Sequence, residues 1–226
     1  MATWVFEPGH TAAEFRARHM MVSWVRGHFK DVHGSLEFDP DNPAQLSIEA
    51  MLQAHKLWTG EPQRDDHLRS GDFLDAGTHP TISFKSTGCK CVGANDYEVA
   101  GVLTIRGVTR PVVLEMHYLG KWRTPYWTDA GDAGPITRVG FMGESRINRH
   151  DFRISWNGQL ENSGVVVSDE VFLKVTAPVT LKKIRKHLGK AHSVYLQRFE
   201  ELLEAAREEK EQERERGGAR EEEGKA

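Results

Sequence analysis

The sequence has few cysteines and no long apolar run. Cys89 and Cys91 are the only two cysteines among 226 residues, and no stretch approaches the roughly 18 consecutive apolar residues that a membrane-spanning helix needs. Two cysteines separated by one residue are poorly placed for a disulfide with each other, and a single Cys-x-Cys is weak support for a zinc site. We therefore expect two unlinked thiols in a reducing compartment.

A secretory signal and a strongly basic surface are also missing. The opening residues Met1 to Trp4 provide no basic region followed by an apolar stretch, so we expect a cytoplasmic protein. The formal net charge of -3 is unevenly distributed, because eleven Glu stand against six Lys or Arg from Glu200 to the end. Neither part of the chain is basic enough to predict binding to nucleic acid.

Motifs of the common catalytic sites are absent as well. The chain contains no Gly-x-Ser-x-Gly, no glycine-rich phosphate loop after a strand and no helical His-Glu-x-x-His. The histidines considered for a shared site are scattered along the chain, a spacing typical of surface or hydrogen-bonded side chains: His10, His19, His28, His33, His67 and His117. We expect no catalytic residue, no metal site and no cofactor; an enzyme with a histidine-rich pocket is the weakest alternative.

The clearest structural signal that is present is a β-hairpin between Tyr97 and Tyr118. Two β-rich runs flank Arg106-Gly107-Val108-Thr109, and Gly107 can adopt the positive φ of a tight turn. Because side chains alternate along a strand, each arm presents one apolar face. These faces consist of Val99, Gly101, Leu103 and Ile105 in the first arm, and of Val112, Leu114, Met116 and Tyr118 in the second.

The same alternation predicts further short strands on both sides of the hairpin. They lie at residues 4–6, 13–17, 27–29, 35–38, 46–54, 81–92, 138–146 and 171–177. His19 to Trp24 breaks the period of two and predicts a helical turn, whereas residues 124–136 are rich in Gly, Pro and Asp and predict a long loop. Many short antiparallel strands separated by turns indicate a mainly β protein, either a barrel or a sandwich.

Two segments depart from the strand pattern. Between Thr59 and Asp75 charged residues predict an irregular helical excursion, capped by Asp65 or Asp66, that covers one end of the barrel. From Leu181 onward apolar residues recur every three or four positions, as in an amphipathic helix. That helix docks on the barrel, pairs with a second copy in a homodimer, or contacts an anionic membrane transiently; its interleaved Glu residues disfavour the membrane.

A series of motifs runs through the first 180 residues. They are Trp4-Val-Phe-Glu-Pro-Gly-His10, Phe15-Arg-Ala-Arg-His19, Thr59-Gly-Glu-Pro-Gln-Arg64-Asp-Asp-His67-Leu-Arg-Ser-Gly-Asp72-Phe73-Leu-Asp75, His79-Pro80-Thr-Ile-Ser-Phe84, Gly101-Val-Leu-Thr-Ile-Arg-Gly-Val-Thr-Arg-Pro111 and Arg146-Ile-Asn-Arg149-His-Asp-Phe152. Together they resemble the YceI-like family of lipocalin-like β-barrels associated with polyisoprenoid binding. The resemblance implies an antiparallel barrel of about eight strands that holds a long isoprenoid chain lengthwise inside.

The alternating strand faces supply the candidate ligand-binding residues. Periodicity does not decide between a packed core and a lined cavity, because a barrel of about eight strands permits either; the resemblance favours the cavity. The candidates are Phe15, His19, Phe29, Ile48, Leu52, Arg64, His67, Phe73, Phe84, Leu103, Leu114 and Phe141. Arg64 and His67 are the contacts expected for a polar headgroup, although the cluster Arg64-Asp65-Asp66-His67 also fits a charge-paired structural cap.

These observations predict one barrel domain at residues 1–180 and a charge-rich helical extension at 181–226 whose end is disordered. The leading hypothesis is non-catalytic binding, with transport or sequestration, of a polyisoprenoid or another long-chain amphiphile such as a quinone. The alternative is an interaction protein with a filled barrel, which recruits a partner or dimerises through its C-terminal helix.

Overall fold

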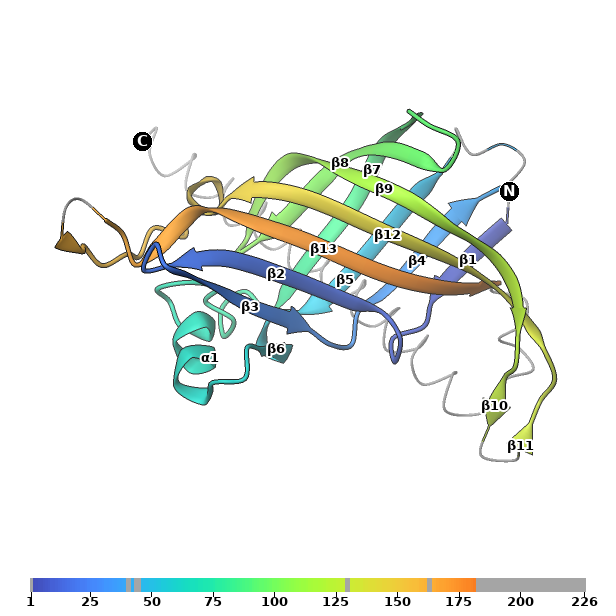
Figure 1. Cartoon of the computed structure of the whole chain (residues 1–226), viewed down its shortest axis with the longest axis horizontal. Helices are drawn as coiled ribbons and strands as arrows, with labels where there is room; N and C mark the ends of the chain where they lie inside the picture. The colour runs from blue at the N-terminus through green and yellow to red at the C-terminus, as the bar shows by residue number, and fades with distance from the viewer. Residues whose placement is uncertain (1, 40–41, 43–45, 129–130, 162–163, 182–226) are drawn as a thin grey trace, which may run out of the picture.

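The chain folds into a closed antiparallel barrel of eight strands (Figure 1). The computed structural model describes residues 2–39, 42, 46–128, 131–161 and 164–181. In ring order, each strand hydrogen-bonded to the next and the last to the first, the barrel consists of β1 (Ala2–Phe6), β4 (His33–Phe38), β5 (Ser47–Gln53), β7 (Thr81–Cys91), β8 (Asp96–Ile105), β9 (Val108–Thr124), β12 (Ile136–Asn148) and β13 (Val167–Leu181). The predicted mainly β, lipocalin-like barrel is confirmed.

Three strands extend the sheet beyond this ring. They are β2 (Ala12–His19), β3 (Ser23–Phe29) and β6 (Leu57–Trp58). The long strand β13 pairs with β1 through Val179 to Leu181 and with β2 through Val167 to Thr176, and β2 is followed in the sheet by β3 and then β6. The sheet therefore leaves the ring at the end of the barrel where β13 stops pairing with β1 and pairs with β2 instead.

A helical segment lies at that end, as predicted for residues 59–75. After the short helix η2 (Ala54–Lys56) and β6, the chain forms α1 (Pro62–Arg69). The predicted caps are wrong: Glu61 caps α1, and its carboxylate accepts hydrogen bonds from the backbone amides of Gln63 (3.3 Å) and Arg64 (2.7 Å). Asp65 is instead buried and accepts from the backbone amide and hydroxyl of Thr59, which ties α1 to the preceding strand.

The central hairpin is confirmed, and its turn explains why. β8 and β9 are joined by Arg106 (φ 51°) and Gly107 (φ 69°), and two consecutive positive φ angles match the twist of antiparallel strands. Val99, Gly101, Leu103 and Ile105 are all buried, as the alternation predicted. β9 continues to Thr124, past the predicted end at Tyr118.

Two other connections differ from the predictions. The helical turn predicted at 19–24 is wrong, because β2 and β3 are joined by the tight loop Met20-Met21-Val22 and register already begins with His19 opposite Ser23. The loop predicted at 124–136 includes a two-stranded ribbon of β10 (Trp127–Thr128) and β11 (Gly131–Asp132). Local polar composition did not reveal this pairing.

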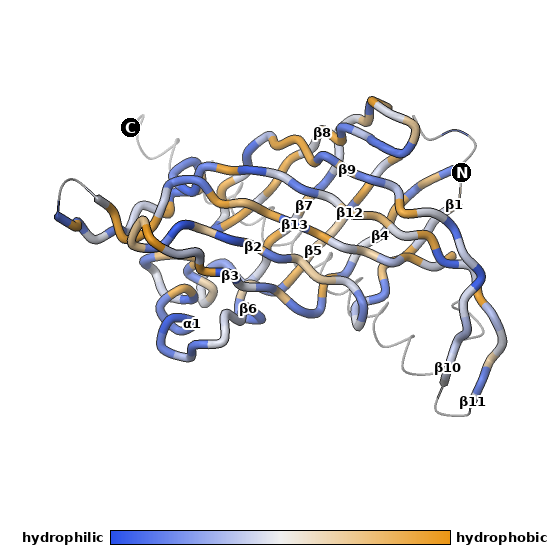
Figure 2. Tube along the Cα trace, in the orientation of Figure 1, coloured by the Kyte–Doolittle hydropathy of each residue, from blue (hydrophilic) through white to orange (hydrophobic). Residues whose placement is uncertain are grey.

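Two apolar clusters pack inside the barrel. Near the N-terminus the rings of Phe38, Tyr118 and Phe141 contact one another with centroids 5.0–5.3 Å apart, and the indole of Trp4 donates to the Phe38 carbonyl at 3.1 Å. Beneath α1 a second cluster surrounds Phe73; its other members are Leu103, Ile105, Val108, Ile147, Phe152 and Ile154. Figure 2 shows hydrophobic and hydrophilic residues alternating along the strands, whereas α1 is mainly hydrophilic.

The remaining predictions concern the cysteines, membrane-spanning helices and the C-terminal helix. Both cysteines are unlinked, as predicted. No helix within the described residues is long and apolar enough to cross a membrane. The predicted C-terminal helix lies outside the described residues, which end at Leu181. The short helix η3 (Arg149–Phe152) completes the set of elements and lies at the α1 end.

Candidate functional site

An apolar cavity of about 160 Å³ lies inside the barrel, and members of both apolar clusters line it. Every strand of the ring contributes to its wall, for example through Phe6 from β1, Leu36 from β4, Leu114 from β9 and Val175 from β13. A dry engineered cavity of roughly 150 Å³ accommodates benzene, so the hollow has room for a small apolar group. The barrel is therefore not completely filled by its own side chains.

Polar side chains are almost excluded from this wall. Glu14, Ser83 and Ser145 are the only polar residues that line it, and the Ser145 hydroxyl is already used as a donor to the Val113 carbonyl at 2.8 Å. Nearby, burial raises the pKa of Tyr118 above its ordinary value, which keeps the phenol neutral. Such a lining can bind hydrocarbon but does not provide a general acid–base pair.

Glycines keep the hollow open by giving aromatic rings room against the wall. Gly27 in β3 lies opposite Phe15, and a Cβ added at Gly27 would stand 2.5 Å from the Phe15 ring. Gly101 in β8 lies against Phe84, and a Cβ there would likewise stand 2.5 Å from the ring. Contacts this short are sterically forbidden, so any larger residue would push these rings into the cavity.

The structure brings most of the predicted binding residues together. The following eight of them line the cavity: Phe15, Phe29, Ile48, Leu52, Phe84, Leu103, Leu114 and Phe141. They come from seven different strands and converge because each occupies an inward position of the alternation. Their contact with a ligand stays a prediction.

The other four predicted residues lie outside the cavity wall. His19 ends β2 at the tight loop, and its carbonyl accepts from the Ser23 hydroxyl at 3.3 Å. Phe73 is buried in the cluster beneath α1. Arg64 donates to the hydroxyl of Thr59 at 2.8 Å, and His67 lies 2.9 Å from the Asp72 carboxylate. These contacts support the structural interpretation of the charged cluster, while a headgroup contact stays a prediction.

The segment at residues 61–80, here called the lid segment, is held over the α1 end by hydrogen bonds from arginines as well as by apolar contacts. Arg106, in the turn of the central hairpin, donates to the carbonyls of Gly71 (2.6 Å), Phe73 (3.2 Å) and Arg153 (2.9 Å). Arg69 donates to the carbonyls of His55 (3.0 Å) and Leu57 (2.6 Å). These hydrogen bonds act together with apolar packing, because Phe73 and Ala76 are buried and Leu68 and Leu74 pack against both clusters.

A buried arginine fixes the neighbouring loop at the same end. Arg149 is only 3% exposed and donates to the carbonyls of Ile154 (2.9 Å), Trp156 (2.7 Å) and Ser168 (3.0 Å). Burial lowers the pKa of its guanidinium, and the nearby Asp169 acts in the opposite direction. Because its guanidinium already donates to these three carbonyls, Arg149 stabilises the loop and is not placed to contact a ligand.

Sequence reasoning missed part of the wall. Ile105, Val112 and Met116 were already assigned to the inward faces of the hairpin and could have been included. Val32 carries no such signal, because it lies in the kink between β3 and β4, where the period of two is interrupted. Within the described residues no group of three or more His, Cys, Asp or Glu side chains is arranged to hold a metal ion.

Comparison with known proteins adds the family context. The family model described as a YceI-like domain matches residues 4–179. A UPF0312 protein from Pseudomonas paraeruginosa is 36% identical over 148 residues, which span 66% of this chain and 73% of that protein.

Solved structures share the fold. Burkholderia cenocepacia BcnA superposes with a TM-score of 0.63 at 24% identity, covering 77% of this chain and 99% of BcnA. A polyisoprenoid binding domain from Saccharophagus degradans, implicated in plant cell wall breakdown, superposes with a TM-score of 0.57 at 10% identity, covering 80% of this chain and 99% of that domain. At these identities the similarity establishes the architecture alone.

Proposed function

Because this chain belongs to the YceI-like family, we propose that its barrel binds the hydrocarbon part of an amphiphilic isoprenoid, such as a quinone or polyprenyl derivative. The observation that carries the proposal is the apolar cavity of about 160 Å³ enclosed by the ring of strands. The solved barrel named as a polyisoprenoid binding domain supports the choice of ligand class, since it has the same architecture.

The energetics favour a ligand that is mostly hydrocarbon. Each methylene moved from water into the cavity contributes roughly 0.8 kcal/mol, so a short apolar segment already gives useful affinity without any polar contact. The described cavity holds only a short segment, and a longer chain requires the space beneath the lid segment. Movement of residues 61–80, which are held by arginine-to-carbonyl hydrogen bonds and by the packing of Phe73, would provide that space.

The proposal includes a role without catalysis, either delivery or sequestration of the lipid. An interior whose wall has only three polar residues protects a hydrocarbon from water but offers no reacting groups. Removal of the lipid from a membrane and its later release fit a protein that encloses the tail and leaves the headgroup near the barrel end.

Organic extraction of the purified full-length protein, followed by mass spectrometry, tests this function. We expect an isoprenoid near one equivalent per chain. Leu103→Asp, which places a carboxylate on the cavity wall, should remove the bound lipid, whereas Val102→Asp at the neighbouring outward position should retain it. If no apolar molecule is recovered and the stripped protein does not bind an apolar fluorescent probe, the proposed function is wrong.

A further inference from the structure

The loop between β2 and β3 exposes three consecutive apolar side chains. Met20, Met21 and Val22 are 46%, 54% and 83% exposed. Met20 and Met21 both have positive φ angles, 51° and 60°, a conformation that costs free energy for residues with a Cβ. Neither exposure nor conformation is explained by packing, although the Met20 amide anchors the loop through the Val166 carbonyl at 2.7 Å.

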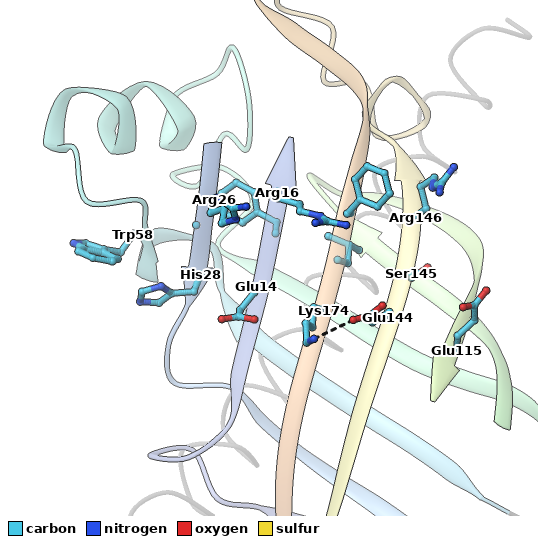
Figure 3. A pocket seen from close by; sticks show the side chains of 14 residues that line it. Glu14, Arg16, Arg26, His28, Trp58, Glu115, Glu144, Ser145, Arg146 and Lys174 are labelled. Carbon is cyan, nitrogen blue, oxygen red and sulfur yellow. Dashed lines mark ion pairs between the residues drawn. The ribbon is translucent and has the colours of Figure 1, made fainter. Parts of the chain in front are cut away.

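Two rows of outward side chains follow this loop along the sheet. In the row next to it, Arg18 lies opposite Trp24, with its guanidinium 4.6 Å from the ring centroid. The next row joins four strands in register: Arg146, Phe172, Arg16 and Arg26. Arg16 and Arg146 lie 4.8 Å and 4.7 Å from the Phe172 centroid. Figure 3 shows Arg26, Arg16 and Arg146 at one level across the sheet.

A third row has the opposite character. It runs across the sheet through Glu115, Glu144, Lys174, Glu14, His28 and Trp58, each in register with the next. Figure 3 shows this row further from α1 than the arginines, with the ion pair between Lys174 and Glu144 (3.0 Å) marked. The row that contains Arg16 and the row that contains Glu14 line an outer groove of about 600 Å³, which shares Glu14, Phe15, Ser145 and Leu173 with the lining of the interior cavity.

The arginines near the loop are not neutralised by the part of the chain that the structure describes. Arg16, Arg18 and Arg26 form no ion pair there, and Arg16 lies directly opposite Arg26, an arrangement of like charges that destabilises a sheet. By contrast, Arg146 pairs with Glu170 at 3.4 Å. Three uncompensated guanidinium groups beside an exposed apolar loop call for an anionic partner that also has an apolar phase.

We propose that this face docks on an anionic membrane surface. The Met20-Met21-Val22 loop enters the acyl boundary, Trp24 and Arg18 occupy the interface, and Arg16 and Arg26 contact lipid phosphates. Successive outward rows are about 7 Å apart along a strand, which is similar to the thickness of a headgroup layer, roughly 5–8 Å. The acidic row then remains in water, so the order of side chains follows the polarity profile of the bilayer.

The opposite end of the barrel provides a competing surface and therefore a control. Trp122 and Trp127 are each 70% exposed near the end of β9 and in β10, at the far end of the long strands from the Met20 loop (Figure 1). One flat membrane cannot contact both ends. The inference concerns the outer face alone and stands whether or not the interior binds an isoprenoid.

Sedimentation of the full-length protein with phosphatidylcholine vesicles, with and without phosphatidylglycerol, tests the proposal. We expect binding only with phosphatidylglycerol, weakened by salt. The double variant Met20→Asn with Met21→Gly introduces residues that tolerate positive φ angles, so Tm should stay the same or rise. Because it removes two apolar side chains, vesicle binding should weaken by about tenfold. Arg16→Gln and Arg18→Gln should each weaken binding about fivefold.

The control variant Trp122→Ser with Trp127→Ser should bind as the parent does. If this control loses vesicle binding while the loop and arginine variants keep it, the membrane contact lies at the Trp122 end and the proposal is overturned. Absence of vesicle binding by the full-length chain also overturns the proposal. This holds even if the cause is that the acidic sequence after Glu200 pairs with the arginines. Equal binding to neutral vesicles would remove the role of the guanidinium groups.

Discussion

At the scale of single residues, the two thiols have different surroundings although one residue separates them. Cys89 packs partly against the barrel core, and burial, with a smaller effect of Cys91, raises the pKa of its thiol. Cys91 is exposed, with its sulfur 3.0 Å from the Gly93 carbonyl. Because the thiolate is the reactive form, a raised pKa leaves Cys89 less reactive at a given pH.

We therefore predict that iodoacetamide near pH 8 modifies Cys91 several-fold faster than Cys89 in the native protein. Peptide mass spectrometry after short reaction times measures both rates. In urea the two rates should converge, because unfolding removes the burial that raises the Cys89 pKa. Preferential native labelling of Cys89 would contradict the placement of these side chains at the end of β7.

Gly143 allows a direct test of the cavity. It lines the hollow on β12, and an added Cβ would stand 3.1 Å from the Leu114 side chain. Gly143→Val should therefore fill part of the space and weaken binding of an apolar fluorescent probe by about tenfold, equivalent to roughly 1.4 kcal/mol. Titration of the lipid-free protein with the probe measures the change.

Gly140→Val is the matched control, because Gly140 lies on the same strand but is not part of the cavity wall. A Cβ at Gly140 would meet Leu119 at 3.2 Å, so the two substitutions introduce similar crowding. If both variants lose the probe equally, the loss reflects damage to β12 and the assigned cavity is not the binding site.

The role of a residue could be predicted where the neighbouring sequence alone reveals it. Leu103 and Leu114 were identifiable because strict alternation surrounds them and their turn contains Gly107. The cap at Glu61 was missed because Asp is a stronger general N-cap preference, and here Asp65 is used to bind Thr59 instead. The left-handed Met20 and Met21 have no sequence signal, since Asn and Gly normally occupy such positions.

At the scale of elements, the lid segment depends on a side chain from the central hairpin. Arg106→Gln removes the charged donor to Gly71, Phe73 and Arg153 and should destabilise this end by about 1–2 kcal/mol. We predict faster amide hydrogen exchange across residues 61–80 and faster release of an apolar probe, while exchange in β12 and β13 stays unchanged. Hydrogen-exchange mass spectrometry and stopped-flow release measure the two effects.

The control for Arg106 is Arg110→Gln in the same hairpin. Arg110 is exposed, and within the described residues its only hydrogen bond goes to the adjacent Thr109 carbonyl, so its loss should leave the lid unaffected. Unchanged exchange at 61–80 in the Arg106 variant would show that Leu68 and Leu74, which pack against both clusters, hold the lid without the arginine.

Elements defined by local chemistry were predictable, and those defined by distant pairing were not. The central hairpin depends on a two-residue turn within 22 residues of sequence, whereas the pairing of β13 with both β1 and β2 joins opposite ends of the domain. The side-chain pattern of β2, β3 and β6 does not reveal that these strands leave the ring at the α1 end. Their divergence is a property of register, which single-strand patterns do not contain.

At the scale of the whole molecule, the alternation predicted a barrel or a sandwich, and the family resemblance favoured a barrel with a cavity. The alternation alone did not show whether the interior was hollow. Gly27 and Gly101 leave room for the rings of Phe15 and Phe84, which line the cavity, and this is a relation between strands rather than within one. The cytoplasmic location, the homodimer and the domain boundary at 180 stay predictions. The membrane contact proposed for the Met20 loop differs from the contact considered for the C-terminal helix.

The hollow also affects the stability of the whole barrel. At roughly 24 cal/mol per Å³, an unfilled cavity of about 160 Å³ costs on the order of 4 kcal/mol relative to a filled one. A hydrocarbon ligand that binds only the folded state recovers part of this cost, and each kcal/mol raises Tm by roughly 2–4 °C in a domain of this size. We predict that reloading the lipid-free protein raises Tm by about 5–10 °C in calorimetry.

The increase should be smaller in Gly143→Val, whose cavity is already partly occupied, and unchanged in Gly140→Val. Equal Tm values for the lipid-free and reloaded parent protein would mean that the ligand does not fill the interior, and the affinity would then have to come from a surface outside the barrel.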